Sequence, residues 1–130
     1  MRHPSLTGLL LAAAMGFSPA VAVPAAAQPN KEAYALYNRF VTAMERCWFG
    51  PNATDFAPYV YSPEPNAATG PRILVVPRNA PHELPVLVVE ITAPGGKAHV
   101  NVYGPLAGSS LSARIGADLR RWMDGSESCA

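Results

Sequence analysis

Residues 86–103 read VLVVEITAPGGKAHVNVY. Two segments rich in β-branched residues, 86–92 and 97–103, flank Ala93-Pro94-Gly95-Gly96, a strong turn signal. The stretch therefore predicts two strands paired as an antiparallel hairpin. Alternation along the strands puts one set of apolar side chains on a face that we expect to pack against helices: Leu87, Val89, Ile91, Val100 and Val102.

The other face of this hairpin carries the candidate site. If Thr92 and Lys97 flank the turn, Glu90 falls opposite His99. A slip of two residues in the turn changes these partners but keeps the two faces. The face then presents both polar and apolar side chains: Val86, Val88, Glu90, His99, Asn101 and Tyr103.

Three interpretations fit this face. An apolar patch with a polar rim is typical of an interface with a protein or a glycan, and Tyr59 and Tyr61 are candidates to extend it. A carboxylate beside an imidazole can perform acid–base chemistry, so a small hydrolase or lyase that uses Glu90 and His99 is the alternative. The third interpretation is an ordinary polar surface, covered in part by the proline-rich segment around Tyr59 to Pro65.

Helices are predicted on either side of the strands. Asn30 is a good N-cap, and apolar side chains then recur at three and four residues until Gly50-Pro51 ends the pattern. A second helix is expected to begin near Ser109 or Ser110, which can cap it, and to stop at Gly125. The two apolar stripes are Ala33, Tyr37, Phe40, Val41, Met44, Cys47 and Trp48 in the first helix, and Leu111, Ile115, Leu119 and Trp122 in the second.

Two further strands complete the fold. Residues 72–76 form a clear one, and residues 56–61 a weak one that Pro58 restricts to a sheet edge. Residues 62–70 and the proline-rich residues 77–85 are expected to be loops. We therefore predict an α+β domain in the order α-β-β-β-β-α, in which a small antiparallel sheet of three to four strands is packed on one face by the N- and C-terminal helices.

The beginning of the chain predicts export. A short basic start is followed by an uncharged apolar run, residues 6–17, which is too short to span a bilayer. Small residues before Ala27 favour cleavage there, with Ala20 and Ala22 as alternatives. We therefore expect a cleaved signal peptide at residues 1–27, a single domain at residues 28–130, a periplasmic or secreted location and no membrane anchor after cleavage.

Cys47 and Cys129 are the chain's two cysteines. A disulfide between them is the default in an exported protein, and it would tie together the C-terminal ends of the two helices. Free or intermolecular thiols are the alternative. Neither C-x-x-C nor a close pair of histidines occurs, so we expect no metal site.

Charge and motifs exclude several other functions. Arg2 lies in the signal, which leaves nine basic and nine acidic side chains in residues 28–130. A neutral domain lacks the basic surface that nucleic acids require. Glycine-rich phosphate-binding motifs are also missing, so we expect no nucleotide and no other cofactor.

Met44-Glu45-Arg46-Cys47-Trp48, at the end of a helix that precedes a short antiparallel sheet and another helix, resembles the periplasmic C-terminal domains of energy transducers such as TonB and TolA. Those domains normally end in a strand and are tethered to the inner membrane, and neither feature is visible in this sequence. The resemblance implies an envelope protein, and no functional residue is carried over from it.

The sequence thus favours a small non-catalytic domain that binds another cell-envelope component through Glu90, His99, Asn101 and Tyr103, with Tyr59 and Tyr61. A structural or homodimeric envelope protein is a further interpretation, and the sequence leaves the oligomeric state open.

Overall fold

The computed structural model describes residues 30–130. The predicted signal peptide, residues 1–27, and its cleavage sites lie outside the described residues. The elements follow the order α1 (Lys31–Cys47), β1 (Tyr59–Glu64), β2 (Arg72–Pro77), β3 (Leu87–Thr92), η1 (Pro94–Gly96), β4 (His99–Tyr103), η2 (Pro105–Gly108) and α2 (Ser112–Met123). This is the predicted α+β order.

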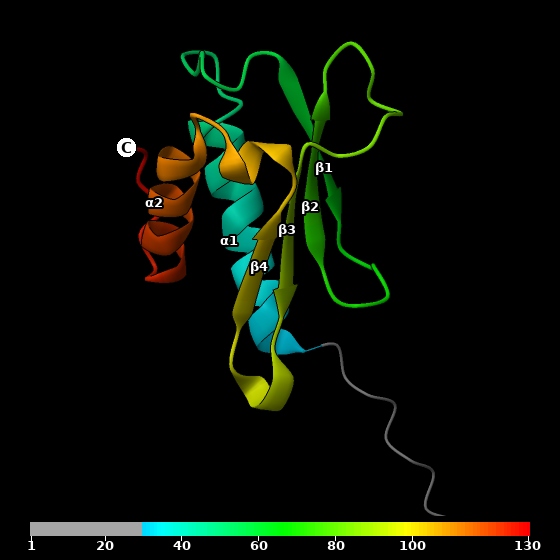
Figure 1. Ribbon diagram of the computed structural model, residues 1–130. Helices are drawn as coiled ribbons and strands as arrows, with labels where there is room; N and C mark the ends of the chain where they lie inside the picture. Colours follow the sequence, from blue (N-terminus) through cyan, green and yellow to red (C-terminus); the bar gives the residue numbers. More distant parts are fainter. Residues whose placement is uncertain (1–29) are drawn as a thin grey trace, which may run out of the picture.

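The four strands form one antiparallel sheet in the order β1-β2-β3-β4, and both helices pack against the same face of it (Figure 1). The core lies between these two layers. Its largest fully buried side chains are Trp48, Trp122, Phe40, Phe56 and Met44. We call the sheet face that carries the helices the inner face, and the opposite one the outer face.

Helix α1 begins where the sequence predicted. The side chain of Asn30 accepts a hydrogen bond from the amide of Glu32 at 3.2 Å and so caps the first turn. Helix α2 begins at Ser112, later than predicted, because the short helix η2 comes first. The hydroxyl of Ser109 accepts from the amide of Leu111 at 3.1 Å, so this serine stabilises the turn before the helix. Gly125, with φ of 101°, follows the end of α2 as expected.

Strand β1 lies three residues later than predicted at its start. Phe56 is instead a core residue, stacked on Trp48 with ring centroids 4.5 Å apart. The strand includes Pro63, which was expected to lie in a loop. The amide of Arg78 donates to the carbonyl of Pro58, so every second residue after Pro58, including Val60 and Ser62, forms hydrogen bonds with β2. Pro63 lies between these residues, and its nitrogen faces away from β2. A proline is tolerated there because β1 is an edge strand.

The hairpin of β3 and β4 has a longer turn than the sequence suggested. A 3-10 turn at Pro94–Gly96, with positive φ at both glycines, joins Thr92 to His99. The register is therefore shifted by two residues from the expected one. Thr92 pairs with His99, Glu90 with Asn101 and Val88 with Tyr103. The faces of residues 87–92 and 99–103 are those predicted, but Val86, expected on the outer face, packs against the core instead. Its amide donates to the carbonyl of Val75, which is already paired with Leu87, so the alternation is interrupted there.

Candidate functional site

The outer face is built by side chains from all four strands. Strand pairing aligns these side chains in rows that run across the sheet from β1 to β4. One row consists of Glu64, Arg72, Glu90 and Asn101. The adjacent row consists of Ser62, Leu74, Val88 and Tyr103. Val60 pairs with Val76 beyond the second row. Within the described residues, no helix or strand lies over this face, as Figure 1 shows.

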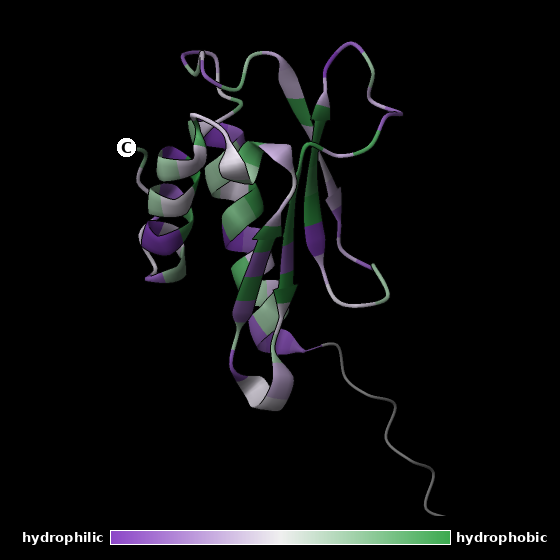
Figure 2. Ribbon diagram, viewed as in Figure 1, coloured by the Kyte–Doolittle hydropathy of each residue, from purple (hydrophilic) through white to green (hydrophobic). Residues whose placement is uncertain are grey.

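Apolar side chains occupy one end of the outer face. They are Val60, Leu74, Val76, Val88 and Tyr103, and they lie next to one another across the sheet. Val76 and Val88 are buried at 5% and 7% exposure, whereas Tyr103 is 43% exposed. We call these five residues the apolar patch. Figure 2 shows how apolar and polar residues alternate along β4, which sends the tyrosine to this face and the valines to the core side.

A chain of charged and polar contacts runs beside the apolar patch. Arg72 Nε lies 2.5 Å from a carboxylate oxygen of Glu64, and the Thr69 hydroxyl donates to Glu90 at 2.5 Å. The hydrogen bond to Glu64 raises the pKa of Arg72, and the nearby charge of Glu90 acts in the same direction. The outer face therefore offers a permanent positive charge between two carboxylates.

The expected pairing of Glu90 with His99 is wrong. Glu90 lies opposite Asn101, and His99 lies opposite Thr92, because the longer turn moves β4 by two residues. The two side chains still share the outer face as diagonal neighbours, a position that typically separates Cα atoms by about 7–8 Å. The hydrogen-bond partner of the Glu90 carboxylate is Thr69.

Tyr59 and Tyr61 lie on the inner face, so the expectation that they extend the outer face is also wrong. Tyr61 pairs with the fully buried Val75, and its ring stacks on Phe49 with centroids 5.0 Å apart. Both tyrosines pack against the core as half-buried residues. The proline-rich segment that contains them is a strand within the sheet, and it does not cover the outer face.

Two surface grooves flank the loop that connects β1 to β2. One, of about 430 Å³, is lined by Glu64, Arg72 and residues of the loop itself. The other, of about 450 Å³, lies between that loop, the start of α1 and the end of β3. The first groove continues the polar row of the outer face. His99 lines neither of them.

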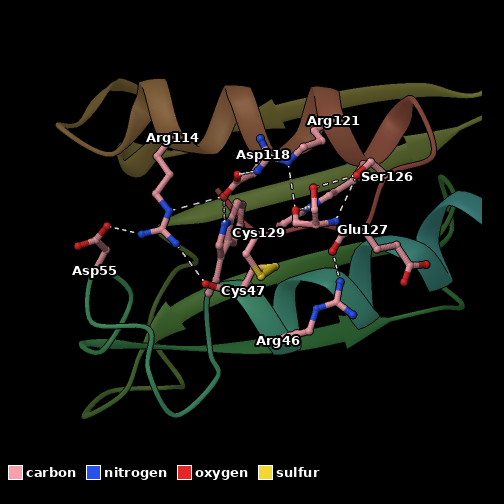
Figure 3. A network of polar contacts seen from close by, with 12 residues as sticks. Arg46, Cys47, Asp55, Arg114, Asp118, Arg121, Ser126, Glu127 and Cys129 are labelled. Atoms are coloured by element: carbon pink, nitrogen blue, oxygen red, sulfur yellow. Dashed lines mark hydrogen bonds and ion pairs between the residues drawn. A yellow bond between two sulfur atoms is a disulfide. The ribbon is translucent and has the colours of Figure 1, made fainter.

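A buried carboxylate in α2 was not predicted from the sequence. Asp118 is fully buried in α2, where it accepts a hydrogen bond from Trp48 Nε1 at 2.7 Å and forms an ion pair with Arg121 (Figure 3). Arg114 Nε lies 3.6 Å from the same carboxylate. The predicted apolar stripe of the second helix did not include Asp118, but this residue is three positions after Ile115 and four before Trp122, which places it on the stripe.

Arg114 connects this carboxylate to the segment that follows α1. Its guanidinium donates to the carbonyl of Cys47 at 3.2 Å, pairs with Asp55 and lies 5.6 Å from the ring centroid of Phe56. Figure 3 shows the guanidinium between Asp55, Asp118 and Cys47. Asp118 is buried at the centre of the network, its arginine partners are partly exposed, and each charge has a partner of opposite sign. The network therefore links the two helices to the 50–56 segment.

The predicted disulfide joins Cys47 to Cys129, with Cα atoms 5.2 Å apart. Side chains also hold the C-terminal tail. Trp122 Nε1 and Arg121 Nε each donate to the carbonyl of Ser128 at 3.1 Å, and Arg46 donates to the carbonyl of Glu127. The bridge is thus one of several contacts that fix the tail against the helices.

Two other features are missing from residues 30–130. No cluster of three or more histidine, cysteine, aspartate or glutamate side chains is arranged to hold a metal ion. None of the helices there is both long enough and apolar enough to cross a membrane.

Comparisons of the chain with protein-family models, curated proteins and solved structures give no match. The resemblance to the energy-transducer domains gains no support from them.

Proposed function

We propose that this chain is an exported, non-catalytic domain that binds another component of the cell envelope through its outer face. The observation that carries the proposal is the apolar surface of the outer face, where the exposed Tyr103 accompanies the half-buried Val60 and Leu74 above the buried Val76 and Val88. Within residues 30–130 no helix or strand lies over it. Export is supported by the signal-like start of the sequence and by the disulfide.

The composition of the outer face supports recognition. Tyrosine and arginine are enriched at protein interfaces, and here Arg72 lies inside one row and Tyr103 at the β4 end of the adjacent row. Glu64, Arg72 and Glu90 form a fixed pattern of negative, positive and negative charge along one row. The apolar patch would supply affinity, and this charged row would select the partner and its orientation.

Catalysis by Glu90 and His99 has less support. A general base needs its orienting carboxylate within hydrogen-bond distance. In this register the carboxylate of Glu90 accepts the Thr69 hydroxyl instead, and His99 faces Thr92 across the strands. Binding therefore remains the favoured function of these residues.

The proposal is tested by affinity capture of the tagged domain, residues 28–130, from its native envelope, with mass spectrometry of the bound material. We expect Tyr103→Ala and Arg72→Ala each to reduce the captured partner at least about tenfold, the effect of removing an interface residue worth about 1.4 kcal/mol. Alanine at Glu90, His99 and Asn101 extends the map along the polar side of the face.

Met123→Ala is the matched control, because Met123 is 42% exposed, much as Tyr103 is, but belongs to α2. Melting temperatures of all variants show whether they fold. Capture that is the same for Tyr103→Ala, Arg72→Ala and the wild type would contradict the proposal.

A further inference from the structure

The two edges of the sheet differ in how well they are protected. At the β1 edge, prolines stand at positions 58 and 63, and the guanidinium of Arg78 donates to the carbonyls of Ala57 and Tyr59 at 3.0 and 3.1 Å. Prolines and capped carbonyls prevent another strand from adding to an edge. The β1 edge is therefore closed.

The β4 edge has no such protection. Its sequence, His-Val-Asn-Val-Tyr, contains neither proline nor a carboxylate or ammonium group. Within residues 30–130, the backbone of β4 forms no hydrogen bond with any segment other than β3. An uncovered edge of this kind is a template for strand pairing.

The hydrogen-bond pattern shows which groups point outward. The amide of Ile91 donates to the carbonyl of Pro71 at 3.0 Å, so the backbone groups of Ile91 and Val89 point to β2. The backbone groups of the residues between and beside them point to β4, where their partners are His99, Asn101 and Tyr103. The N–H and C=O groups of Val100 and Val102 are therefore directed to the open edge.

The side chains next to this edge favour an apolar neighbour. Val100 and Val102 lie on the inner face, where they are half-buried at the margin of the core. A groove of about 210 Å³ lies close by, lined by four apolar residues, Ala35, Leu36, Ala98 and Met123, and by the charged Glu32 and Arg39. A strand added to β4 would complete the burial of the two valines.

We propose that β4 pairs antiparallel with β4 of a second copy of this chain, about a twofold axis at Asn101. Val100 then lies opposite Val102 of the second copy, and the outward N–H and C=O groups of both residues are satisfied on both chains. The two sheets become one continuous sheet with all helices on the same side.

A second copy fits because the strand is complementary to itself in this register. A twofold interface requires each residue to match its counterpart. His99 faces the uncharged Tyr103 of the second copy, Asn101 faces Asn101, and the valines face each other, so no like charges are opposed. The same pairing brings the two outer faces side by side.

Such an interface is small. It consists mainly of one short strand from each chain, so the surface area that it buries is below the roughly 1,600 Å² of a standard stable complex. We expect a reversible dimer with a dissociation constant on the order of 1–100 µM, which corresponds to weak association.

Sedimentation velocity of the purified domain over a wide concentration range tests the pairing without the envelope partner. We expect the wild type to change from monomer to dimer as its concentration rises. Asn101→Lys and Asn101→Asp should each remain monomeric, because the twofold axis opposes like charges, and a mixture of the two should dimerise. Ser62→Lys is the control, since Ser62 is exposed on the outer face at the closed edge.

A dimer formed through the outer face instead of the edge is distinguished by Val100→Pro. This change removes an outward N–H group from an edge strand and leaves every outer-face side chain in place. We expect it to raise the dissociation constant at least tenfold, and amide exchange at Val100 and Val102 to slow as the wild-type concentration rises. A wild type that stays monomeric, a mixture that fails to associate, or unaltered dimerisation of Val100→Pro would overturn the inference. Partner capture by the outer face is measured separately, so either proposal can fail alone.

Discussion

The indole Nε1 of Trp48 donates a hydrogen bond to the carboxylate of Asp118 at 2.7 Å, and this contact joins the end of α1 to the middle of α2. Both residues are fully buried. Because the carboxylate also pairs with Arg121 and lies near Arg114, it neutralises charge at the point where the helices meet.

Asp118→Ala should therefore lower the free energy of unfolding by about 3 kcal/mol, the lower part of the range for breaking a buried ion pair, since both arginines are partly exposed. Asp118→Asn keeps an acceptor for the indole and should cost less. Urea denaturation followed by tryptophan fluorescence measures both. Equal stability of Asp118→Ala and the wild type would show that the network is dispensable.

The disulfide closes a loop between residues that are 82 positions apart. On the chain-entropy model such a bridge contributes about 4–5 kcal/mol, so reduction should markedly lower the denaturation midpoint. A thiol assay on denatured, unreduced protein should find no free thiol, and two free thiols would contradict the bridge. Cys129→Ser should match the reduced wild type, and reducing agent should not destabilise it further.

Gly104 has φ of 114°, and a Cβ atom at this position would lie 2.6 Å from the carbonyl oxygen of Val86. Gly104→Ala should destabilise the fold by about 2 kcal/mol, because both the backbone conformation and the close approach are unsuited to alanine. Gly108 has open space around its Cβ position, so Gly108→Ala is the control and should change stability by less than about 0.5 kcal/mol. Thermal unfolding of the two variants compares them directly.

Burial raises the pKa of Tyr37 above its ordinary value of 10.0, and Tyr34 and Glu64 raise it further. A raised folded-state pKa means that the stabilisation is complete below pH 10 and is lost as the pH rises through the folded-state pKa. Stability should therefore fall above pH 10, and Tyr37→Phe should weaken this dependence. Burial also raises the pKa of Tyr61, so part of the alkaline loss should remain in that variant. A pH series of urea midpoints measures the difference.

The sequence was sufficient for the order of the elements and for the two faces of the hairpin of β3 and β4, because both follow from local periodicity. Alternation in residues 86–103 determines which side chains of β3 and β4 face the helices, whatever the turn. The register depends on the length of the turn, and the 3-10 turn at Pro94–Gly96 could not be distinguished from a tighter one by residue type.

Contacts between distant parts of the chain account for the remaining errors. Tyr59 and Tyr61 alternate with Val60 in either orientation, and only the pairing with β2 decides that the tyrosines face the core. The position of Asp118 on the apolar stripe was visible in the sequence. Its partner Trp48 is 70 residues away, so the hydrogen bond that compensates for the burial of Asp118 could not be predicted from the sequence.

The disulfide also constrains events in time. Cys129 follows every helix and strand described here, so Cys47 has no bonding partner until α2 has been synthesised. A chain interrupted before that point cannot close the bridge. An oxidised Cys47–Cys129 pair therefore identifies a chain that contains every element from the end of α1 to α2.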